Sequence, residues 1–312
     1  MKENLSQPLA RVTLRHLRAV TAVIQSGSMS GAARLLGITT PAVNQQINAL
    51  EDIVGMPLFD RSGSGMQATS AGLGMLDTAE RIDSVLAEFG QTLQSLRGME
   101  VGRFNFGVVS TAKYFAPKAL AAFAALHPKV EMRLQVGNRG DMIAALEHHR
   151  LDFVVMGQPP PELDAEKVEI ADHPHIIIAP PGHPMASARQ IPLQDVARDS
   201  FLLREKSSGT RILVEQLFHG AGLDPNLGTE MGSNETIKQA VMAGLGIALI
   251  SAHTVHTEIH DGRLTQLDVA GLPINRKWFA VKMRTKRLLP AAQAFWEFII
   301  HSSRDFLPGS GA

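Results

Sequence analysis

The chain contains no cysteine, which excludes disulfide bridges, thiolate metal sites and catalysis by a thiol. It carries no formal net charge, with 30 Lys+Arg against 30 Asp+Glu, so any contact with nucleic acid has to be local. No apolar run approaches the ~18 residues that a membrane helix needs, and the N-terminal stretch has no signal-type apolar core. These absences predict a location in a reducing cytosol, without membrane contact.

What is present describes a folded chain. Its 312 residues, 45% of them hydrophobic and 19% charged, predict two or three domains with sizeable cores. Residues 1–62 hold six Lys+Arg against four Asp+Glu, a net charge of +2, so the small positive excess lies at the N-terminal end.

The stretch from Ser28 to Glu51 predicts two short helices joined by a tight turn. Ser28 can cap the first of these helices, and Gly37 can supply its left-handed stop. Thr39 or Thr40 can cap the second helix. Another helix with an apolar stripe, from about residue 14 to Gly27, precedes them.

The second helix of this pair predicts a buried stripe and a polar face. Val43, Ile47, Leu50 and Val54 recur at helical spacing, which leaves Thr40, Asn44, Gln45 and Asn48 pointing outward. Amide and hydroxyl side chains can read base edges in a major groove, and the pattern is typical of a helix-turn-helix unit. An ordinary helical hairpin with a solvated polar face fits this stretch equally well.

Two features follow this unit. The glycine-rich loop from Arg61 to Met66 is suited to a wing lying against phosphates. Residues 70–97 then carry apolar residues at alternating spacings of four and three, a sustained heptad that indicates a coiled-coil seam. A long helix packed on its own domain is the alternative, and pairing of two chains is favoured because a reading head gains from two-fold symmetry.

Beyond a hinge at residues 98–102, strands and helices alternate, which predicts βαβ units and a parallel sheet. The expected strands are 103–109, 130–136, 152–156, 175–179, 201–204, 228–231, 246–251 and 278–283, and the expected helices are 117–126, 141–149, 209–220, 235–243 and 290–301. This arrangement predicts two α/β lobes, the second inserted into the first, with a ligand between them at the carboxyl ends of the strands.

At this point the chain resembles the LysR-type transcriptional regulators. The resemblance is carried by Ala32-Ala33, Leu36, Thr39, Pro41-Ala42-Val43, Gln46-Ile47, Leu50-Glu51, Gly55, Leu58-Phe59, Arg61, Thr69 and Ala71-Gly72. It implies a winged helix-turn-helix domain at 1–69, a dimerising linker helix at 70–97, the hinge at 98–102, and a two-lobed Rossmann-like domain at 103–312, similar to a periplasmic binding protein. Lobe I would comprise about 103–172 and 270–312, and lobe II about 173–269.

The C-terminal part looks closer to one subgroup, the regulators of the Calvin-cycle RuBisCO operon. The matching stretches are 110–117, 136–139, 155–160, 178–184 and 233–240. The subgroup implies an effector that is a phosphorylated or nucleotide metabolite, while another operon with a non-phosphorylated organic acid is the alternative. The family also implies operator DNA, RNA polymerase and a homodimer as partners, with a tetramer left open.

Candidate site residues follow from both arguments. The DNA-binding set is Ser28, Arg34, Thr39, Thr40, Pro41, Asn44, Gln45, Asn48 and Arg61. Thr40 and Asn44 depart from the usual family residues, so the operator sequence is open. The set predicted to bind an anionic effector at strand ends and helix starts is Ser110, Thr111, Lys113, Asn138, Arg139, Ser208, Gly209, Thr210, Arg211, Asn234, Glu235 and Thr236. Each of these taken singly fits an ordinary cap or loop.

No catalytic residue, metal or cofactor is predicted. His253, His256 and His260 lie near helical spacing without a supporting ligand pattern. The cationic run from Arg276 to Arg287 is interpreted as a solvated strand edge or an assembly surface. A solute-binding protein would leave the first 97 residues unexplained, and an α/β enzyme would need a nucleophile elbow, a carboxylate pair or a phosphate loop that does not stand out.

Overall fold

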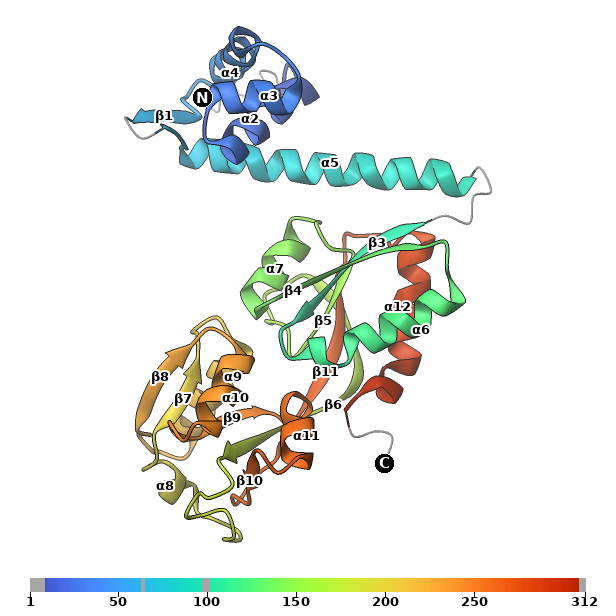
Figure 1. Ribbon diagram of the computed structural model, residues 1–312. Coiled ribbons are helices and arrows are strands. Elements are labelled where there is room, and N and C mark those ends of the chain that lie inside the picture. Colours follow the sequence, from blue (N-terminus) through green and yellow to red (C-terminus); the bar gives the residue numbers. More distant parts are fainter. Residues whose placement is uncertain (1–8, 63–64, 97–101, 309–312) are drawn as a thin grey trace. The chain divides into compact units, whose positions relative to one another are not determined.

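Residues 9–62, 65–96 and 102–308 are described by the computed structural model of the chain (Figure 1). Contacts divide the chain at Gly90 into two units, and each is described by itself. Among the described residues, no helix is both long and apolar enough to cross a membrane. The predicted hinge at 98–102 lies almost wholly outside the described residues.

The first unit contains three short helices, a hairpin and most of a long helix. They are α2 (Leu14–Ser26), α3 (Met29–Leu36), α4 (Thr40–Val54), β1 (Phe59–Ser62), β2 (Gly65–Ala68) and α5 (Ser70–Leu96). The predicted caps are confirmed, because Ser28 Oγ accepts from Gly31 N at 3.0 Å and Gly37 ends α3 at φ 65°. Of the two candidate caps for α4, it is Thr39 that accepts from Ala42 N.

The three helices and the hairpin enclose one core. Val43, Ile47 and Leu50 are buried in α4, as the stripe predicts, and Leu58 and Phe59 close the core from the chain that follows. The hairpin β1–β2 is antiparallel, which gives the unit the wing expected from the glycine-rich loop. The unit is a winged helix-turn-helix.

The long helix α5 changes character along its length. Ala79 is buried and Met75 packs against the core of the first unit. Farther on, Leu86, Phe89 and Leu93 of the same heptad stripe are 42%, 60% and 40% exposed. The start of α5 is therefore anchored by its own domain, and the rest carries an apolar stripe.

The second unit is built on a seven-stranded mixed sheet. Its strands are β3 (Arg103–Val109), β4 (Glu131–Gly137), β5 (Phe153–Met156), β6 (Ala165–Ala179), β9 (Ala248–Ser251), β10 (Thr265–Leu267) and β11 (Ile274–Met283). The path runs β10-β6-β11-β5-β3-β4, and β9 pairs with β6. A smaller parallel pair is formed by β7 (Phe201–Arg204) and β8 (Leu227–Met231).

The parallel sheet expected from the alternating pattern is only part of the arrangement. Strands β3, β4 and β5 are parallel, but β11 runs antiparallel to both β5 and β6. The expected strand 175–179 is the end of β6, which has 15 residues. Its first part was not predicted, because its exposed charged residues interrupt the apolar run that marks a buried strand.

The strands β6 and β11 connect two lobes (Figure 1). Lobe I carries β3, β4 and β5 with the helices η1 (Ala112–Tyr114), α6 (Ala116–Leu126), α7 (Arg139–Glu147), α12 (Pro290–Ser302) and η2 (Ser303–Phe306). Lobe II carries β7, β8, β9 and β10 with α8 (Leu193–Val196), α9 (Gly209–Gly220), α10 (Asn234–Met242) and α11 (Ala252–His260). The chain thus leaves lobe I along β6 and returns along β11, so the second lobe is inserted into the first.

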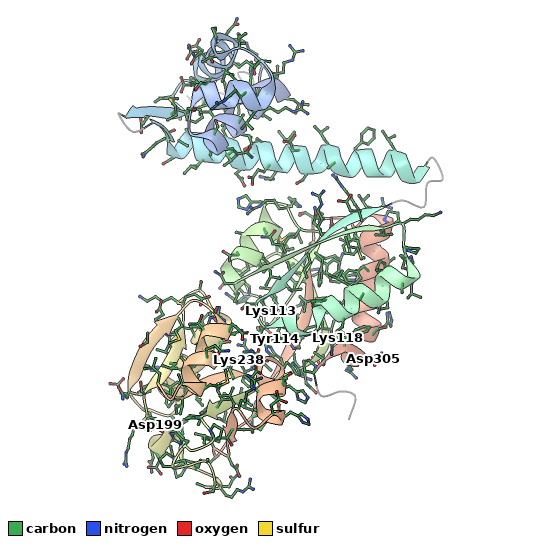
Figure 2. The ribbon with its side chains drawn as sticks, in the orientation of Figure 1. Lys113, Tyr114, Lys118, Asp199, Lys238 and Asp305 are labelled. Carbon is green, nitrogen blue, oxygen red and sulfur yellow. The ribbon has the colours of Figure 1, made fainter. Side chains whose placement is uncertain are left out.

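Side chains of the two lobes meet beside the connecting strands. Tyr114 of lobe I and Lys238 of lobe II point toward each other, with the Lys238 ammonium 4.9 Å from the centre of the Tyr114 ring (Figure 2). Tyr114 also donates a hydrogen bond to Glu235 at 3.0 Å. The lobes are therefore in direct contact in this conformation.

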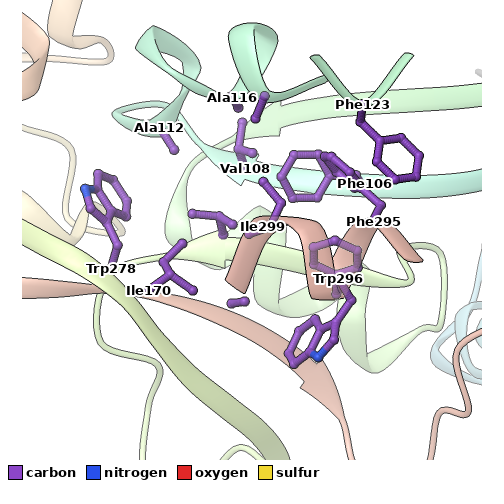
Figure 3. Close-up of a cluster of buried hydrophobic side chains, with 14 of the residues drawn as sticks. Phe106, Val108, Ala112, Ala116, Phe123, Ile170, Trp278, Phe295, Trp296 and Ile299 are labelled. Atoms are coloured by element: carbon purple, nitrogen blue, oxygen red, sulfur yellow. The ribbon is translucent and has the colours of Figure 1, made fainter. Parts of the chain in front are cut away.

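Each lobe has helices on both faces of its strands. In lobe I, Phe106, Phe123 and Phe295 gather beneath α6 and α12 (Figure 3), while α7 packs on the opposite face around Met142. The ring centres of Phe106 and Phe123 lie 5.1 and 4.9 Å from that of Phe295. In lobe II, α9 covers one face, and α10 and α11 cover the other.

The cationic run from Arg276 to Arg287 is not a strand edge, so that interpretation is wrong. Strand β11 lies inside the sheet, between β6 and β5. Its lysines pair with carboxylates of β6: Lys277 lies 2.9 Å from Glu169, and Lys282 lies 2.7 Å from Glu166. The spacing of charges along a strand does not reveal which neighbours flank it, so the sequence could not distinguish an edge from an interior strand.

Candidate functional sites

A cleft of about 190 Å³ lies between the lobes. It is bordered by the carboxyl ends of β3, β5 and β7, the first residues of α7 and α9, and the connecting strands β6 and β11. Its lining consists of Val109, Ser110, Thr111, Asn138, Arg139, Gly157, Gln158, Pro159, Pro160, Pro161, His173, His175, Arg204, Ser208, Gly209, Thr210, Ile212, Gln216 and Arg276. Ligands of open α/β sheets bind at such a place, beyond the carboxyl ends of strands.

The cleft is lined by three guanidinium groups, and none of its lining residues is acidic. Arg204 is buried and already paired, since its Nε donates to Glu205 Oε2 at 2.8 Å and its side chain also donates to Asn234. Arg139 and Arg276 form no ion pair with a carboxylate among the described residues. Burial, and then the nearby charge of Arg139, lower the pKa of the Arg276 guanidinium. The cleft therefore holds two positive charges whose mutual repulsion an anion would relieve.

Hydroxyl groups and a helix start complete the cleft. Ser208 caps α9 by accepting from Thr210 N, so the positive end of this 12-residue helix faces the cleft. Across the cleft, Asn138 and Asp141 satisfy each other's backbone N–H groups at the start of α7. Because part of the start of α7 is already capped, the Arg139 side chain is a better donor for an anion than the backbone N–H groups of that helix.

Two histidines of β6 form the floor. The His173 ring stacks on Trp278, with ring centres 3.7 Å apart and planes 14° apart, and it lies 4.3 Å from the His175 ring. Burial lowers the pKa of His173 well below its usual value and that of His175 to about 3. Both imidazoles are therefore neutral at neutral pH in this conformation.

The structure brings seven of the twelve predicted effector residues to one cleft. They are Ser110, Thr111, Asn138, Arg139, Ser208, Gly209 and Thr210. The carboxyl ends of β3 and β4 supply the first four, and the start of α9 supplies the other three, which is the symmetry of position that the alternating pattern suggested.

The other five lie outside the cleft lining. Arg211 turns away to Glu215, at 2.6 Å, and to Glu230. Lys113 lies over the Tyr114 ring, whereas Asn234 is buried behind the cleft as an acceptor for Arg204. Glu235 and Thr236 belong to the first turn of α10, where Glu235 pairs with Lys238 and Thr236 N donates to the cap Ser233.

Four charged or titratable cleft residues were not predicted: Arg204, His173, His175 and Arg276. The two histidines alternate along β6, so they face the same side of the strand, and this spacing is the one signal that could have suggested them. Arg276 was noted only as part of the cationic run. Its place opposite His173 depends on the pairing of β11 with β6, which a sequence pattern does not specify.

In the first unit, the polar residues of α4 form an exposed face. Pro41, Gln45 and Asn48 are exposed, and Thr40 and Asn44 are half-buried. Thr39 is an exposed cap residue, Ser28 caps α3 while half-buried, and Arg34 is exposed on α3. Arg61 is a residue of β1, but its side chain lies outside what the structure describes. The named residues of α4 are uncharged, which suits contacts with base edges. Arg34 on α3 is a cation, which suits a contact with a phosphate.

No group of three or more His, Cys, Asp or Glu residues with metal-binding geometry occurs in the described parts of the chain. His253, one of the three helically spaced histidines, instead accepts a hydrogen bond from Trp278 Nε1 at 3.2 Å.

Two family models match the chain. Residues 14–73 match the model described as bacterial regulatory helix-turn-helix protein, lysR family. Residues 97–304 match the model described as LysR substrate binding domain. The two matches follow the division into a helix-turn-helix unit and a two-lobed unit.

Relatives match over most of their length. An HTH-type transcriptional regulator CbbR of Xanthobacter flavus is 49% identical over 298 residues, which cover 95% of this chain and 90% of that protein. A RuBisCO operon transcriptional regulator of Allochromatium vinosum is 40% identical, with 93% of this chain and 96% of that protein covered. Among solved structures, the regulatory domain of CcmR from Synechocystis PCC6803, in complex with 2-PG, is 36% identical, has a TM-score of 0.62, and covers 64% of this chain and 96% of its own.

Proposed function

The chain belongs to the LysR family of transcriptional regulators, and we propose that it controls a carbon-fixation operon in response to a phosphorylated metabolite bound between its two lobes. Relatives of 40–49% identity over almost the whole chain, named as CbbR and RuBisCO operon regulators, support the choice of operon. The observation that carries the choice of effector is the cleft with two uncompensated guanidinium groups and no acidic residue in its lining.

The chemistry of the cleft favours phosphate over an apolar acid. Guanidinium groups bind phosphate oxygens in pairs of charge-assisted hydrogen bonds, which are about twice as strong as neutral ones. Arg139 comes from the start of α7 and Arg276 from the connecting strand β11, and the start of α9 adds backbone donors and a positive dipole end. The regulatory domain of the Synechocystis relative was solved with 2-PG, 2-phosphoglycolate, which is a compound of this class.

The proposed roles divide along the chain. Residues 1–69 read operator DNA through the exposed face of α4 and through Ser28, Arg34 and Arg61. Residues 70–97 pair two chains, and residues 103–312 bind the effector. The seven predicted residues that line the cleft, together with Arg204, Arg276, His173 and His175, form the effector site. A dimer places two reading heads on a pseudo-palindromic operator, where RNA polymerase responds to the bound complex in the cytoplasm. Association of dimers into tetramers would use further surfaces.

Effector binding acts by setting the angle between the lobes. Arg204 of lobe II already donates to Ser110 of lobe I at 3.4 Å, and Arg139 of lobe I lies against Gly209 of lobe II. An anion that bridges Arg139 and the start of α9 stabilises this closed arrangement over any open one, in proportion to its difference in affinity for the two.

A thermal-shift panel tests the effector class. The wild-type chain is heated with sugar phosphates, 2-phosphoglycolate, ribulose bisphosphate and NADPH, each beside its dephosphorylated analogue. A ligand at ~100 times its Kd adds ~2.7 kcal/mol to the native state and should raise the Tm by several degrees. Arg139→Ala should remove the shift, whereas Arg198→Ala, which replaces an exposed arginine paired with Asp195, should keep it.

Two outcomes overturn parts of this proposal. If non-phosphorylated organic acids raise the Tm while no phosphate does, the effector class is wrong and the family assignment stands. A gel shift with DNA upstream of a carbon-fixation operon tests the target separately. Binding to that DNA no tighter than to random DNA would exclude the operon as the target.

A further inference from the structure

His173 is a buried imidazole whose two ring nitrogens have no hydrogen-bond partner among the described residues. The side chain is only 4% exposed and lines the cleft. A buried donor or acceptor without a partner is costly, and native structures rarely keep one without a ligand, ion or water to satisfy it. The stacking on Trp278 fixes the plane of the ring, so the imidazole cannot turn elsewhere for a partner without losing that contact.

The residue beside this ring at position 157 is a glycine, so no side chain from that position covers the imidazole. A Cβ placed on Gly157 would lie 3.9 Å from His173 Nδ1, and Gly157 itself lines the cleft. The ring is also directly opposite Arg276 in the pairing of β6 with β11. An anion held by Arg276 is therefore adjacent to an imidazole that can donate to it.

The basic groups around His173 come from several elements. His175 is on the same strand, His253 is on α11, Arg276 is on β11, and Arg139 faces Arg276 from α7. All four are basic, and no acidic residue lines the cleft, so this environment opposes a proton on His173 while the cleft is empty. A phosphate dianion reverses the sign of the local field, which favours a protonated imidazole that donates a hydrogen bond.

We infer that the imidazole of His173 is a ligand contact that takes up a proton when a phosphate dianion enters the cleft. This inference rests on the proposed function, and it makes the affinity for the effector depend on pH. His173 protonates more readily in the complex than in the free protein, so binding is tighter at lower pH and weakens as pH rises through the pKa of the complex. A regulator of this kind reports metabolite concentration and proton concentration together.

Calorimetry of 2-phosphoglycolate binding to the full chain measures the proton directly. Titrations at about pH 7.5 in two buffers of different ionisation enthalpy give the number of protons taken up; the second pKa of a phosphate monoester is about 6, so the free ligand is mainly the dianion. For the wild type we expect uptake of about half a proton or more, and a Kd that rises up to about tenfold per pH unit. His173→Gln keeps an amide that can hydrogen-bond but cannot titrate, so it should bind with uptake near zero and a flat pH profile.

Two further variants separate contact from structure. His219→Gln changes an exposed histidine of α9 that does not line the cleft, and it should behave as wild type. Gly157→Ala leaves the imidazole in place and fits without a clash, but puts a methyl group in van der Waals contact with Nδ1. Gly157→Ala should weaken binding of 2-phosphoglycolate about tenfold or more and reduce the proton uptake. This variant keeps the inference testable should His173→Gln not fold.

The outcomes distinguish this inference from the function on which it rests. If 2-phosphoglycolate binds with the same Kd and the same proton uptake to wild type, His173→Gln and Gly157→Ala, the role of His173 is wrong and the phosphate site stands. If neither 2-phosphoglycolate nor any phosphate of the thermal-shift panel binds, both proposals fall.

Discussion

The hydroxyl of Tyr114 donates to Glu235 Oε2 at 3.0 Å and thereby joins the two lobes. Tyr114 ends the short helix η1 of lobe I, and Glu235 lies in the first turn of α10 in lobe II. Lys238 is close to both, with its ammonium 3.2 Å from Glu235 and 4.9 Å from the centre of the Tyr114 ring. Because the contact joins the two lobes, a change in the angle between them should alter it.

Tyr114 gives this contact a spectroscopic signal, because it is the single tyrosine of the chain. Burial raises the pKa of its hydroxyl to about 12, the Lys238 charge opposes this, and the hydrogen bond to Glu235 adds to it. Absorbance near 295 nm should therefore titrate with a midpoint near 12 rather than 10. Because this pKa is raised in the folded state, the protonated Tyr114 hydroxyl contributes its full share of stability below pH ~10, and that contribution is lost as pH rises toward 12.

Glu235→Gln tests the assignment, because it removes the carboxylate charge and should lower the Tyr114 midpoint. Circular dichroism at the same pH values checks that the chain stays folded. A midpoint near 10 in a wild-type chain that is still folded would contradict the hydrogen bond between Tyr114 and Glu235.

Lys238 should be essential to the stability of lobe II. Its side chain is 3% exposed and its ammonium lies 2.7 Å from Glu258, which is also buried. Lys238→Met leaves the Glu258 carboxylate without its main partner and should lower the free energy of unfolding by about 3 kcal/mol. The double variant with Glu258→Leu should recover most of that free energy. Urea unfolding followed by tryptophan fluorescence is the measurement, because Trp278 and Trp296, the two tryptophans, both lie in the second unit.

Lys277→Met is the matched control for this experiment. Lys277 also contacts two carboxylates, Glu169 and Asp172, but its side chain is 43% exposed. Ion pairs that are exposed to solvent contribute little to stability, so this change should be nearly neutral. Equal losses for the two lysines would mean that burial does not set the strength of the Lys238 pair.

The features that the sequence predicted well are local ones. Ser28, Gly37 and Thr39 act within three or four residues along the chain, so their roles as caps follow from residue type and spacing. The strands 103–109 and 201–204 and the helix 209–220 were predicted with the observed bounds, because each is a distinct apolar or periodic segment between turn residues.

The features that it missed depend on distant segments. Arg204 reaches Ser110 across 94 positions in the chain, and Arg276 faces His173 through strand pairing across more than 100. Helix α11 and strand β10 were also missed, since one is short and interrupted by polar residues and the other has only three residues. Seven of the residues that line the candidate cleft were predictable from strand ends and helix starts, whereas the residues on the connecting strands that form its floor were not.

The apolar stripe of α5 should pair two chains. Phe89 is 60% exposed, with Leu86 and Leu93 exposed beside it, so a partner helix would bury all three. Phe89→Asp places a charge in that seam, where it would be buried without a partner, and should turn the dimer into a monomer in sedimentation equilibrium. Thr78→Asp adds the same charge at an exposed position off the stripe and should stay dimeric. A dimeric Phe89→Asp chain would exclude α5 as the interface.

The face of α4 should determine which DNA sequence is bound, and α3 should contribute affinity for any sequence. Asn44 is a half-buried amide between the exposed Pro41 and Asn48, and a base-edge contact from such a side chain is worth ~1–3 kcal/mol for the correct base. Asn44→Ala should therefore weaken binding to the operator by that amount while binding to random DNA stays nearly unchanged. Arg34 is exposed on α3, outside the proposed reading helix α4, where a cation is suited to a phosphate contact that does not depend on sequence; Arg34→Ala should therefore weaken both DNAs alike and reduce the slope of log K against log salt by about 1. Fluorescence anisotropy at several salt concentrations measures both quantities on the same samples.

The two variants alter different terms of the same binding free energy. Equal losses of affinity for operator and random DNA in Asn44→Ala, with an altered salt slope, would assign Asn44 to contacts with the phosphate backbone. The reading face would then lie elsewhere on the unit.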